Sequence, residues 1–344
     1  MPGTGGRFRC GGLQVELQTA RLVGQLRPTE LVTYRQREAG TPFLADLLRG
    51  EPAPGQALWV VSWGFDVPPL LRRLRGRPVA YHAHSSGYGF DLPAGVPVLA
   101  VSRNTLGYWG ERASRNPLFL VPNALEPQWL ERGARGTSPG GAHPNAASPR
   151  RRIDVLVQQR KNSAYVLQQL VPALRRAGLR VEVQSGWVED LVDLFNSATV
   201  VLYDSADYWR GRGVSEGFGL PPLEALACGC VVFSSLNHAL ADSLDPGLVG
   251  HQIGFGSLEA DLQRIASAVA APQAWLPQPG RLAPRLECCS EPALLERWGG
   301  ALQAIDGHWQ LMLGSGGSAL TTPPLWWLRS ASLRGRLRRW LARG

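Results

Sequence analysis

The chain has 344 residues, 44% of them hydrophobic and 18% charged, which is ordinary for a globular protein of about two domains. Its net charge of +9 favours anionic partners, whether nucleotide diphosphates, nucleic acid or acidic lipid headgroups. No apolar run approaches the ~18 residues of a membrane span, so the composition excludes a transmembrane protein.

The first half of the chain is predicted to alternate short strands with helices. A glycine-rich opening, residues 1–12, runs into a helical pattern, and no strand is predicted before it. The apolar positions of this helix are Leu13, Leu17, Leu22 and Leu26. Brief apolar runs predict strands at residues 31–34, 58–65, 79–84, 98–102 and 118–121, with a short basic helix over residues 69–75. Such alternation favours a parallel sheet covered on both faces.

Two histidines, His82 and His84, stand at the end of the strand predicted at residues 79–84. We expect their side chains on opposite faces of the strand, which argues against a shared metal ion. Ligands bind outside the carboxyl ends of strands in open parallel sheets, so one histidine is a candidate for the site, and we favour His84. The alternative is an ordinary hydrogen-bonded histidine.

A segment without residues suited to a core divides the chain. It predicts a disordered or flexible linker over residues 127–151, between an N-terminal domain (residues 1–126) and a C-terminal domain (residues 152–305). The second half resumes the alternation. Strands are predicted at residues 153–157, 181–183, 199–203 and 231–235, and helices at residues 166–178 and 190–195, with Pro172 bending the first helix or lying near its start. Two such halves imply a nucleotide-sized cleft between them.

One lysine follows the strand at residues 153–157. Lys161 is the single lysine among 36 basic residues, and Arg160 precedes it. A compact ammonium suits a phosphate as a point charge. The alternative is a chance lysine on an exposed loop.

The richest stretch begins with Glu216 in a predicted loop. Gly217 and Gly219 allow the backbone to approach a ligand closely. Pro221 and Pro222 fit the first turn of a helix, and Glu224 is expected in that same turn.

The start of this helix favours phosphate, because its N–H groups and dipole attract anions. The two carboxylates can accept hydrogen bonds from the diols of a sugar and a ribose. In the alternative reading Glu224 caps its own helix and Glu216 is solvated.

Residues 306–344 form a C-terminal extension of a different kind. Its last part, Thr321–Gly344, contains no acidic residue and carries Trp326, Trp327, Trp340, Arg329, Arg334, Arg336, Arg338, Arg339 and Arg343. A basic helix with tryptophans suits an anionic membrane surface. The alternative is a helix that packs back on the domains through a stripe of leucines.

The run Glu216-Gly-Phe-Gly-Leu-Pro-Pro-Leu-Glu224 resembles the glutamate, seven residues, glutamate motif of retaining GT-B glycosyltransferases, which use nucleotide sugars. The segments Val121–Leu125 and Tyr81–Ser85 resemble other parts of that family in the right order, and the resemblance covers roughly residues 10 to 305. It implies an α/β fold class: two Rossmann-like domains whose parallel sheets face across a cleft. We expect the N-terminal domain to lack the family's usual first strand.

The resemblance also implies roles for single residues. Glu224 would bind the donor ribose, and the catalytic residues would be Glu216, which also binds a sugar hydroxyl, Lys161 and His84. The diphosphate and sugar would be held by Arg160, Lys161, Gly217, Phe218, Gly219 and Leu220. The segment Asp204–Arg212, with Trp209 and Arg210, is extra and is expected to shape the sugar pocket. No Asp-x-Asp pair is present, so we expect no metal and no cofactor besides the nucleotide-diphosphate sugar.

We therefore expect a retaining hexosyltransferase that acts on a polysaccharide, lipid-linked or other envelope acceptor, in the cytoplasm or peripherally at the inner membrane. Five cysteines without zinc-like or CxxC spacing agree with a reducing compartment. One alternative is a degenerate, non-catalytic GT-B-like nucleotide-binding protein, suggested by the missing strand. A nucleic-acid-binding protein would rest on charge alone, and we expect no nucleic acid partner.

Overall fold

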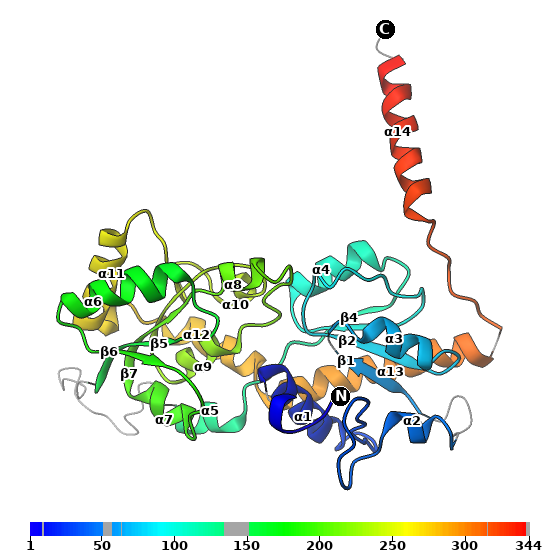
Figure 1. The fold of residues 1–344 in the computed structure, drawn as a ribbon, viewed down its shortest axis with the longest axis horizontal. Coiled ribbons are helices and arrows are strands. Elements are labelled where there is room, and N and C mark those ends of the chain that lie inside the picture. Colours follow the sequence, from blue (N-terminus) through cyan, green and yellow to red (C-terminus); the bar gives the residue numbers. More distant parts are fainter. Residues whose placement is uncertain (9, 51–56, 63, 134–150, 315, 342–344) are drawn as a thin grey trace.

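A computed structural model of the chain describes residues 1–8, 10–50, 57–62, 64–133, 151–314 and 316–341. Two α/β domains lie side by side, and each is built on one parallel sheet (Figure 1). This architecture confirms the predicted fold class.

The N-terminal domain contains a parallel sheet in the order β1-β2-β3-β4. Its strands are β1 (Trp59–Ser62), β2 (Val79–Ala83), β3 (Val98–Ala100) and β4 (Leu118–Leu120). Its helices are α1 (Gly11–Val23), α2 (Leu44–Leu47), α3 (Val67–Arg73) and α4 (Arg103–Arg112). Alternate residues of β2 enter different cores, because Tyr81 packs with Trp109 on one face and Ala80 packs with Trp298 on the other.

The strand predicted at residues 31–34 is wrong, because this segment forms loop hydrogen bonds instead of a ladder. The Tyr34 N–H donates to the carbonyl oxygen of Met1 (2.9 Å), and one isolated bridge joins Thr33 to Phe43. Before α1, the described residues hold a 3-10 turn at Gly6–Phe8 and no strand, as predicted. Leu26, expected on the helix, lies beyond its end and is exposed.

The C-terminal domain contains a parallel sheet in the order β6-β5-β7-β8-β9. Its strands are β5 (Ile153–Gln158), β6 (Val181–Gln184), β7 (Ala198–Tyr203), β8 (Val231–Ser234) and β9 (His251–Gln252). Its helices are α5 (Pro127–Arg132), α6 (Val171–Arg176), α7 (Leu191–Asn196), α8 (Ala206–Arg210), α9 (Leu220–Ala227), α10 (Leu240–Ser243), α11 (Leu258–Ala270) and α12 (Pro279–Cys288). Shorter turns are a π-helical one at Val166–Leu170 and a 3-10 one at Pro272–Ala274. The strands predicted for this half are confirmed, and Pro172 lies in the first turn of α6.

The segment predicted as a linker is partly helical. Its first residues form α5, whose Trp129 packs against Phe195 in the C-terminal core. The rest of the predicted linker, residues 134–150, lies outside the described residues.

Helix α13 (Glu291–Gly314) returns the chain to the N-terminal domain. Its Trp298 and Leu302 share a core with Leu99 of β3. The predicted C-terminal domain, residues 152–305, therefore included part of a helix that packs on the N-terminal sheet.

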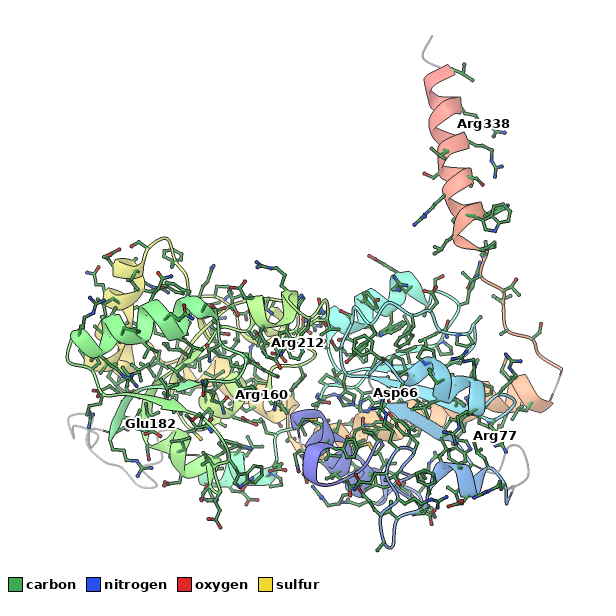
Figure 2. All side chains as sticks on the ribbon, in the orientation of Figure 1. Asp66, Arg77, Arg160, Glu182, Arg212 and Arg338 are labelled. Atoms are coloured by element: carbon green, nitrogen blue, oxygen red, sulfur yellow. The ribbon has the colours of Figure 1, made fainter. Side chains whose placement is uncertain are left out.

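Helix α14 (Leu325–Leu341) projects away from both domains (Figure 1), and Arg338 stands near its far end (Figure 2). The alternative in which this helix packs back on the domains is wrong, since none of its described side chains belongs to a hydrophobic core. Its exposed apolar residues are Leu325, Trp326, Trp327, Leu328, Leu333 and Leu341. Within the described ranges, no helix has both the length and the apolar character needed to span a bilayer.

Candidate active site

The two domains meet where the loop after β2 touches the loop before α9. The Ser86 N–H donates to Ser215 Oγ (2.9 Å), and the Ser85 hydroxyl donates to the carbonyl oxygen of Ser215 (2.7 Å). At position 217 a Cβ would lie 1.5 Å from the carbonyl oxygen of His84, so only glycine fits. Gly217 was predicted to let the backbone approach a ligand, and in the structure it lets the two domains approach each other.

Glu216 follows this contact and is only 4% exposed. Its Oε2 accepts hydrogen bonds from the Tyr203 hydroxyl (2.5 Å) and from Trp209 Nε1 (2.7 Å). Its Oε1 lies 3.5 Å from Lys161 Nζ. One carboxylate oxygen therefore accepts hydrogen bonds from two neutral donors, while the other faces a cation. The alternative in which Glu216 is solvated is wrong.

The Tyr203 hydroxyl is a permanent donor in this cluster. Burial, together with the adjacent charge of Glu216, holds the pKa of Tyr203 well above its usual range. Tyr203 was missed by the sequence reasoning, although a tyrosine that ends a predicted strand was an available signal. Because β5 and β7 are neighbours in the sheet, their carboxyl ends bring Lys161 and Tyr203 to the same edge.

Lys161 lies in the loop after β5 with a left-handed φ of 67°, which is unfavourable for a lysine. The side chain of Asn162 holds this loop, since it donates to the carbonyl oxygen of Gln158 (2.6 Å) and accepts from the Asp204 N–H (2.8 Å). The Lys161 ammonium then lies 4.7 Å from the centre of the Trp209 ring. This placement does not fit a chance lysine on an exposed loop.

Trp209 belongs to α8, within the segment predicted to shape the sugar pocket. The structure places its indole against both groups of the pair: Nε1 donates to the Glu216 carboxylate, and the ring faces the Lys161 ammonium, which the sequence did not indicate. Arg160 is exposed, and no ion pair to it is found among the described residues. The structure therefore brings Lys161 to Glu216 and leaves Arg160 outside this cluster.

Helix α9 begins beside the cluster, with Gly219 before it in a left-handed conformation (φ 86°). The first four N–H groups of a helix have no partner within it. Pro221 and Pro222 lack an N–H, so Gly219 and Leu220 supply the free donors of this turn. Together with Phe218, these are the residues whose backbone N–H groups the resemblance assigns to the sugar and diphosphate.

Glu224 is the fifth residue of α9, so its predicted place in the first turn, and with it the capping role, is wrong. The side chain is half-buried. Burial, followed by the charge of Glu126, raises the pKa of Glu224 to about 8, and Lys161 partly opposes this. At neutral pH the carboxyl is therefore largely protonated, a form that donates as well as accepts hydrogen bonds.

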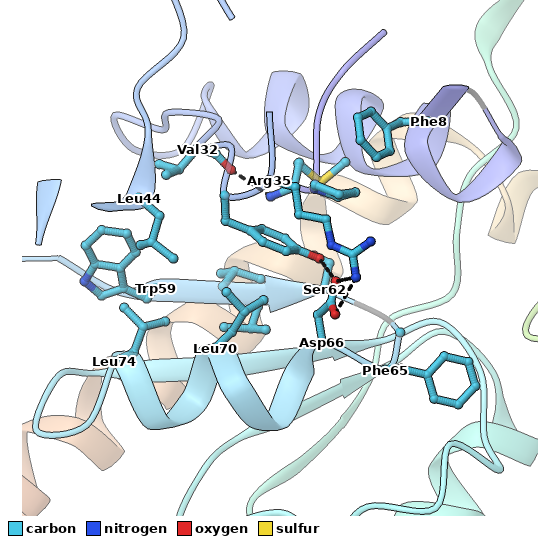
Figure 3. A pocket seen from close by; sticks show the side chains of 16 residues that line it. Phe8, Val32, Arg35, Leu44, Trp59, Ser62, Phe65, Asp66, Leu70 and Leu74 are labelled. Atoms are coloured by element: carbon cyan, nitrogen blue, oxygen red, sulfur yellow. Dashed lines mark hydrogen bonds and ion pairs between the residues drawn. The ribbon is translucent and has the colours of Figure 1, made fainter. Parts of the chain in front are cut away.

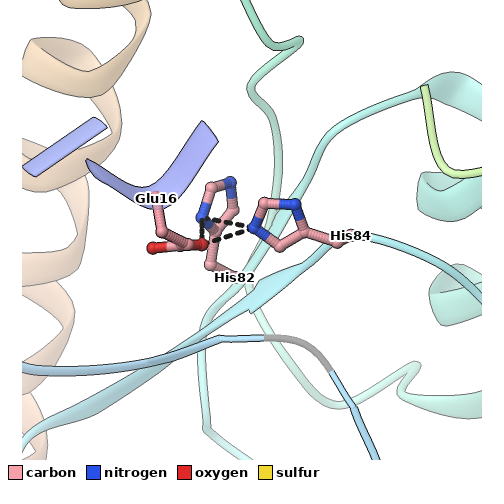
Figure 4. A group of neighbouring side chains, drawn as sticks. All are labelled: Glu16, His82 and His84. Atoms are coloured by element: carbon pink, nitrogen blue, oxygen red, sulfur yellow. Dashed lines mark hydrogen bonds and ion pairs between the residues drawn. The ribbon is translucent and has the colours of Figure 1, made fainter. Parts of the chain in front are cut away.

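The two histidines point to the same side of β2, toward α1 (Figure 4). The prediction of opposite faces is wrong, because residues two apart in a strand share a face. Their ring centroids lie 4.2 Å apart. Glu16 of α1 joins them, with its Oε1 2.8 Å from His82 Nδ1 and in contact with His84 Nε2.

Glu16 is a buried carboxylate that the sequence reasoning missed. Burial alone would raise the pKa of Glu16, but the two histidines hold it well below its usual range. Burial, followed by the neighbouring His82, lowers the pKa of His84. The signal in the sequence was an acidic residue three positions after Leu13, on the apolar face of a predicted helix.

A separate cavity of about 260 Å³ lies alongside β1 in the N-terminal domain (Figure 3). Beside it, Asp66 accepts hydrogen bonds from the Tyr34 hydroxyl (2.6 Å) and from Arg35 Nη2 (2.6 Å). Its larger apolar lining residues are Phe8, Trp59, Phe65, Leu70 and Leu74. A mainly apolar concavity with a few polar groups is typical of small-molecule sites, so this cavity is a candidate second site.

Three solved structures show what the chain is similar to. A glycosyltransferase from Rickettsia africae ESF-5 aligns with a TM-score of 0.59 at 12% identity, over 87% of this chain and 96% of that chain. The apo form of the lipopolysaccharide outer core galactosyltransferase WaaB gives 0.55 at 14% identity, over 88% and 97%. HepE from Anabaena in complex with UDP gives 0.51 at 15% identity, over 72% and 79%. No protein-family model matches the sequence, and no curated protein does.

At these identities the comparisons show the fold and leave the activity to be argued from the site. The alignments with the Rickettsia enzyme and WaaB extend over most of the chain, and so include both of its parallel sheets. The chain therefore has the two-domain GT-B fold of glycosyltransferases, the fold that the glutamate motif predicted.

Proposed function

We propose that this protein is a retaining hexosyltransferase that moves a sugar from a nucleotide-diphosphate donor to a glycan or lipid-linked acceptor. The observation that carries the proposal is the cluster of Lys161, Tyr203, Trp209 and Glu216 beside the domain boundary. It places a cation, an anchored carboxylate and an aromatic ring together. A diphosphate sugar presents the matching groups, namely an anion, hydroxyls and a sugar ring.

The donor diphosphate is proposed to lie against Lys161 and the start of α9. The backbone N–H groups of Phe218, Gly219 and Leu220 stand at that end, and the exposed Arg160 is close enough in sequence to reach the same anion. Breaking the bond between sugar and phosphate develops negative charge on the diphosphate. Fixed cations and N–H donors stabilise that charge without a metal at the diphosphate. The UDP in the HepE structure supports a nucleoside diphosphate as a ligand of this fold.

The donor sugar and ribose are assigned to the two glutamates. Glu216 Oε1 is the oxygen that remains to accept a sugar hydroxyl, because Oε2 is held by Tyr203 and Trp209. Glu224 lies further along α9 and would bind the ribose. A sugar at Glu216 would lie against the His84 segment, since the carbonyl oxygen of His84 meets Gly217.

The acceptor is proposed to be a component of the cell envelope, reached at the cytoplasmic face of the inner membrane. The name of WaaB, a lipopolysaccharide outer core galactosyltransferase, supports an envelope acceptor for this fold. Helix α14 supports the membrane surface, because it exposes Trp326 and Trp327 together with Arg329, Arg334 and Arg338. Such a helix binds anionic headgroups through its arginines and the bilayer surface through its tryptophans.

A second candidate is a non-catalytic nucleotide-binding protein with the same fold. One observation favours it: the Glu216 carboxylate is already engaged by its own chain. This reading predicts nucleotide binding without transfer of any sugar.

A thermal-shift panel of UDP, GDP, ADP and TDP tests the proposal. A ligand that binds only the folded state raises the unfolding temperature, and we expect one base to do so strongly. The matching nucleotide sugars are then assayed for release of the diphosphate with an envelope glycan as acceptor. No shift with any nucleotide would sink the donor assignment, and a shift without release for any sugar would favour the non-catalytic reading.

A further inference from the structure

Three ligand-type side chains converge inside the N-terminal domain. They are Glu16 from α1, His82 from β2 and His84 just after β2 (Figure 4). One potential ligand atom from each residue lies within 4.8 Å of the other two. His82 Nδ1 and His84 Nε2 are 3.2 Å apart, and both approach the same oxygen, Glu16 Oε1.

The convergence follows from the backbone. Residues two apart in a strand share a face, so His82 and His84 both project toward the helix that covers it. Glu16 lies on the buried face of that helix and is 7% exposed, while His82 is 1% exposed. The carboxylate is therefore removed from water together with both imidazoles.

A buried carboxylate needs a compensating positive charge. Among the described residues, no lysine or arginine forms an ion pair with Glu16, and its partners are the two imidazoles. Both ring nitrogens are directed at one oxygen and lie close to each other, so a cation among the three atoms would find lone pairs from all of them. The site thus offers a carboxylate and two imidazoles whose potential ligand atoms converge, and no lysine or arginine pairs with it among the described residues.

We propose that Glu16, His82 and His84 bind one divalent transition-metal ion of the zinc class. Two imidazoles and one carboxylate form a ligand set that suits zinc and its neighbours, while the imidazoles disfavour magnesium and calcium, which prefer oxygen. An ion about 2.0–2.2 Å from each ligand atom fits if the three side chains move apart only slightly from their present contacts. The ion would cross-link α1 to β2.

The site shares His84 with the residues that the resemblance assigns to catalysis, but it does not include the proposed diphosphate site. The diphosphate is assigned to Lys161 and α9 in the C-terminal domain, and no step assigned there needs an ion at Glu16. The competing explanation is a hydrogen-bonded triad in which both imidazoles donate to Glu16 Oε1. His82 Nε2 has no hydrogen-bond partner in the described chain and packs against Trp298 (5.2 Å between rings), so it does not separate the two explanations: it is an unpaired acceptor in the triad and an unpaired N–H when Nδ1 binds the ion.

The test uses the full chain, stripped with a chelator and titrated with zinc or cobalt ions. Bound metal is measured by elemental analysis after desalting, affinity by competition with a chromophoric chelator, and coordination by the visible spectrum of the cobalt form. We expect about one zinc per chain in a high-affinity site. Glu16→Gln keeps the size of the side chain but removes its charge, and should weaken zinc binding by more than about tenfold, as should His84→Ala.

Two control variants separate this site from adventitious binding. His251→Ala removes a histidine of the C-terminal domain that bonds to the Trp275 carbonyl oxygen, and Cys288→Ser removes an exposed thiol. Both should bind zinc as the unchanged chain does. Circular dichroism checks that each variant is folded, and if His82→Ala is not, the other two ligand variants decide.

Wild-type affinity in Glu16→Gln and His84→Ala, or no zinc retained by the unchanged chain, would overturn the proposal in favour of the hydrogen-bonded triad. Neither result would alter the nucleotide panel, so the metal site and the proposed transferase activity fail separately.

Discussion

The ammonium of Lys161 lies 3.5 Å from Oε1 of Glu216, although 55 positions separate the two residues in the chain. The pair balances the charge of Glu216, which is 4% exposed, without any bound ligand. A diphosphate that drew the ammonium toward itself would leave Oε1 ready for a sugar hydroxyl. Nucleotide and sugar recognition would then be coupled through this one contact.

Replacing Glu216 tests the sugar contact. Glu216→Gln keeps an acceptor for the Tyr203 hydroxyl but removes the charge that faces Lys161. We expect kcat/KM for the donor sugar to fall by about 100-fold or more, in the range found for electrostatic groups at active sites. Affinity for the bare nucleoside diphosphate, measured by calorimetry, should change much less. Near-normal turnover would contradict the assignment.

Lys161 and Arg160 are predicted to differ in their contributions. Lys161→Ala should weaken binding of the nucleoside diphosphate by about 10- to 100-fold, because a charged hydrogen bond contributes about 1.5–3 kcal/mol. Arg160→Ala should have a smaller effect, since Arg160 stands outside the cluster.

Lys161→Gly is the matched control for the backbone. Glycine accepts the left-handed φ of 67° without strain, so Lys161→Gly should lose the same affinity as Lys161→Ala and be more stable. If Lys161→Gly kept full affinity, the ammonium would not be the diphosphate ligand.

The indole of Trp209 is predicted to act through Glu216. Trp209→Phe keeps an aromatic ring beside Lys161 but loses the Nε1 bond to Glu216 Oε2. We expect KM for the donor sugar to rise by about tenfold, with the bare diphosphate bound as before. Trp187→Phe, at a position that is 78% exposed, is the control and should be neutral. Equal weakening of the bare diphosphate would show that the ring supports Lys161 instead.

The raised pKa of Glu224 predicts a pH dependence of stability. The carboxyl titrates near pH 8 in the folded chain and at its ordinary value near 4.5 when unfolded, so the folded state holds more protons between these values. Stability should therefore fall as pH rises from about 4.5 to 8. Glu224→Gln should remove this fall and stabilise the chain on the order of 1 kcal/mol at pH 9, with little change at pH 4.

Denaturant unfolding at a series of pH values measures this effect. Glu126→Gln is the matched variant, because the charge of Glu126 helps to raise the pKa of Glu224. It should move the fall in stability to lower pH without abolishing it. A Glu224→Gln profile parallel to that of the unchanged chain would refute the assignment of the raised pKa.

Helix α14 is predicted to bind membranes but not to contribute to the stability of the folded chain. Removal of residues 325–344 should leave the unfolding temperature unchanged, because the described side chains of α14 belong to no core. It should abolish sedimentation with vesicles that contain anionic phospholipid.

The same vesicle assay can separate the contribution of charge to membrane binding from that of apolar contact. Replacing Arg329, Arg334 and Arg338 by glutamine should cost about 1 kcal/mol of binding for each residue and reduce its dependence on salt. A truncated chain that still binds the vesicles would place the membrane surface elsewhere on the molecule.

The strands were predictable because short apolar runs between glycines and prolines are local signals. The run at residues 31–34 failed because its polar backbone bonds to Met1 and to the segment around Leu44, which no local pattern reveals. The end of the C-terminal domain was misjudged for a similar reason. The apolar face of α13 is visible in the sequence, but which sheet it covers depends on the packing of Trp298 against the N-terminal core.

The sequence by itself determined the two-domain α/β fold and singled out Glu216 and Lys161, since strand patterns, a motif and a lone lysine are all properties of the linear chain. Only the tertiary structure decided that Tyr203 and Trp209 hold one oxygen of Glu216 while Lys161 faces the other. It alone joined Glu16 to the two histidines. The physical reason is that both groups are assembled by strand order and helix packing, which bring together side chains that local propensity cannot relate.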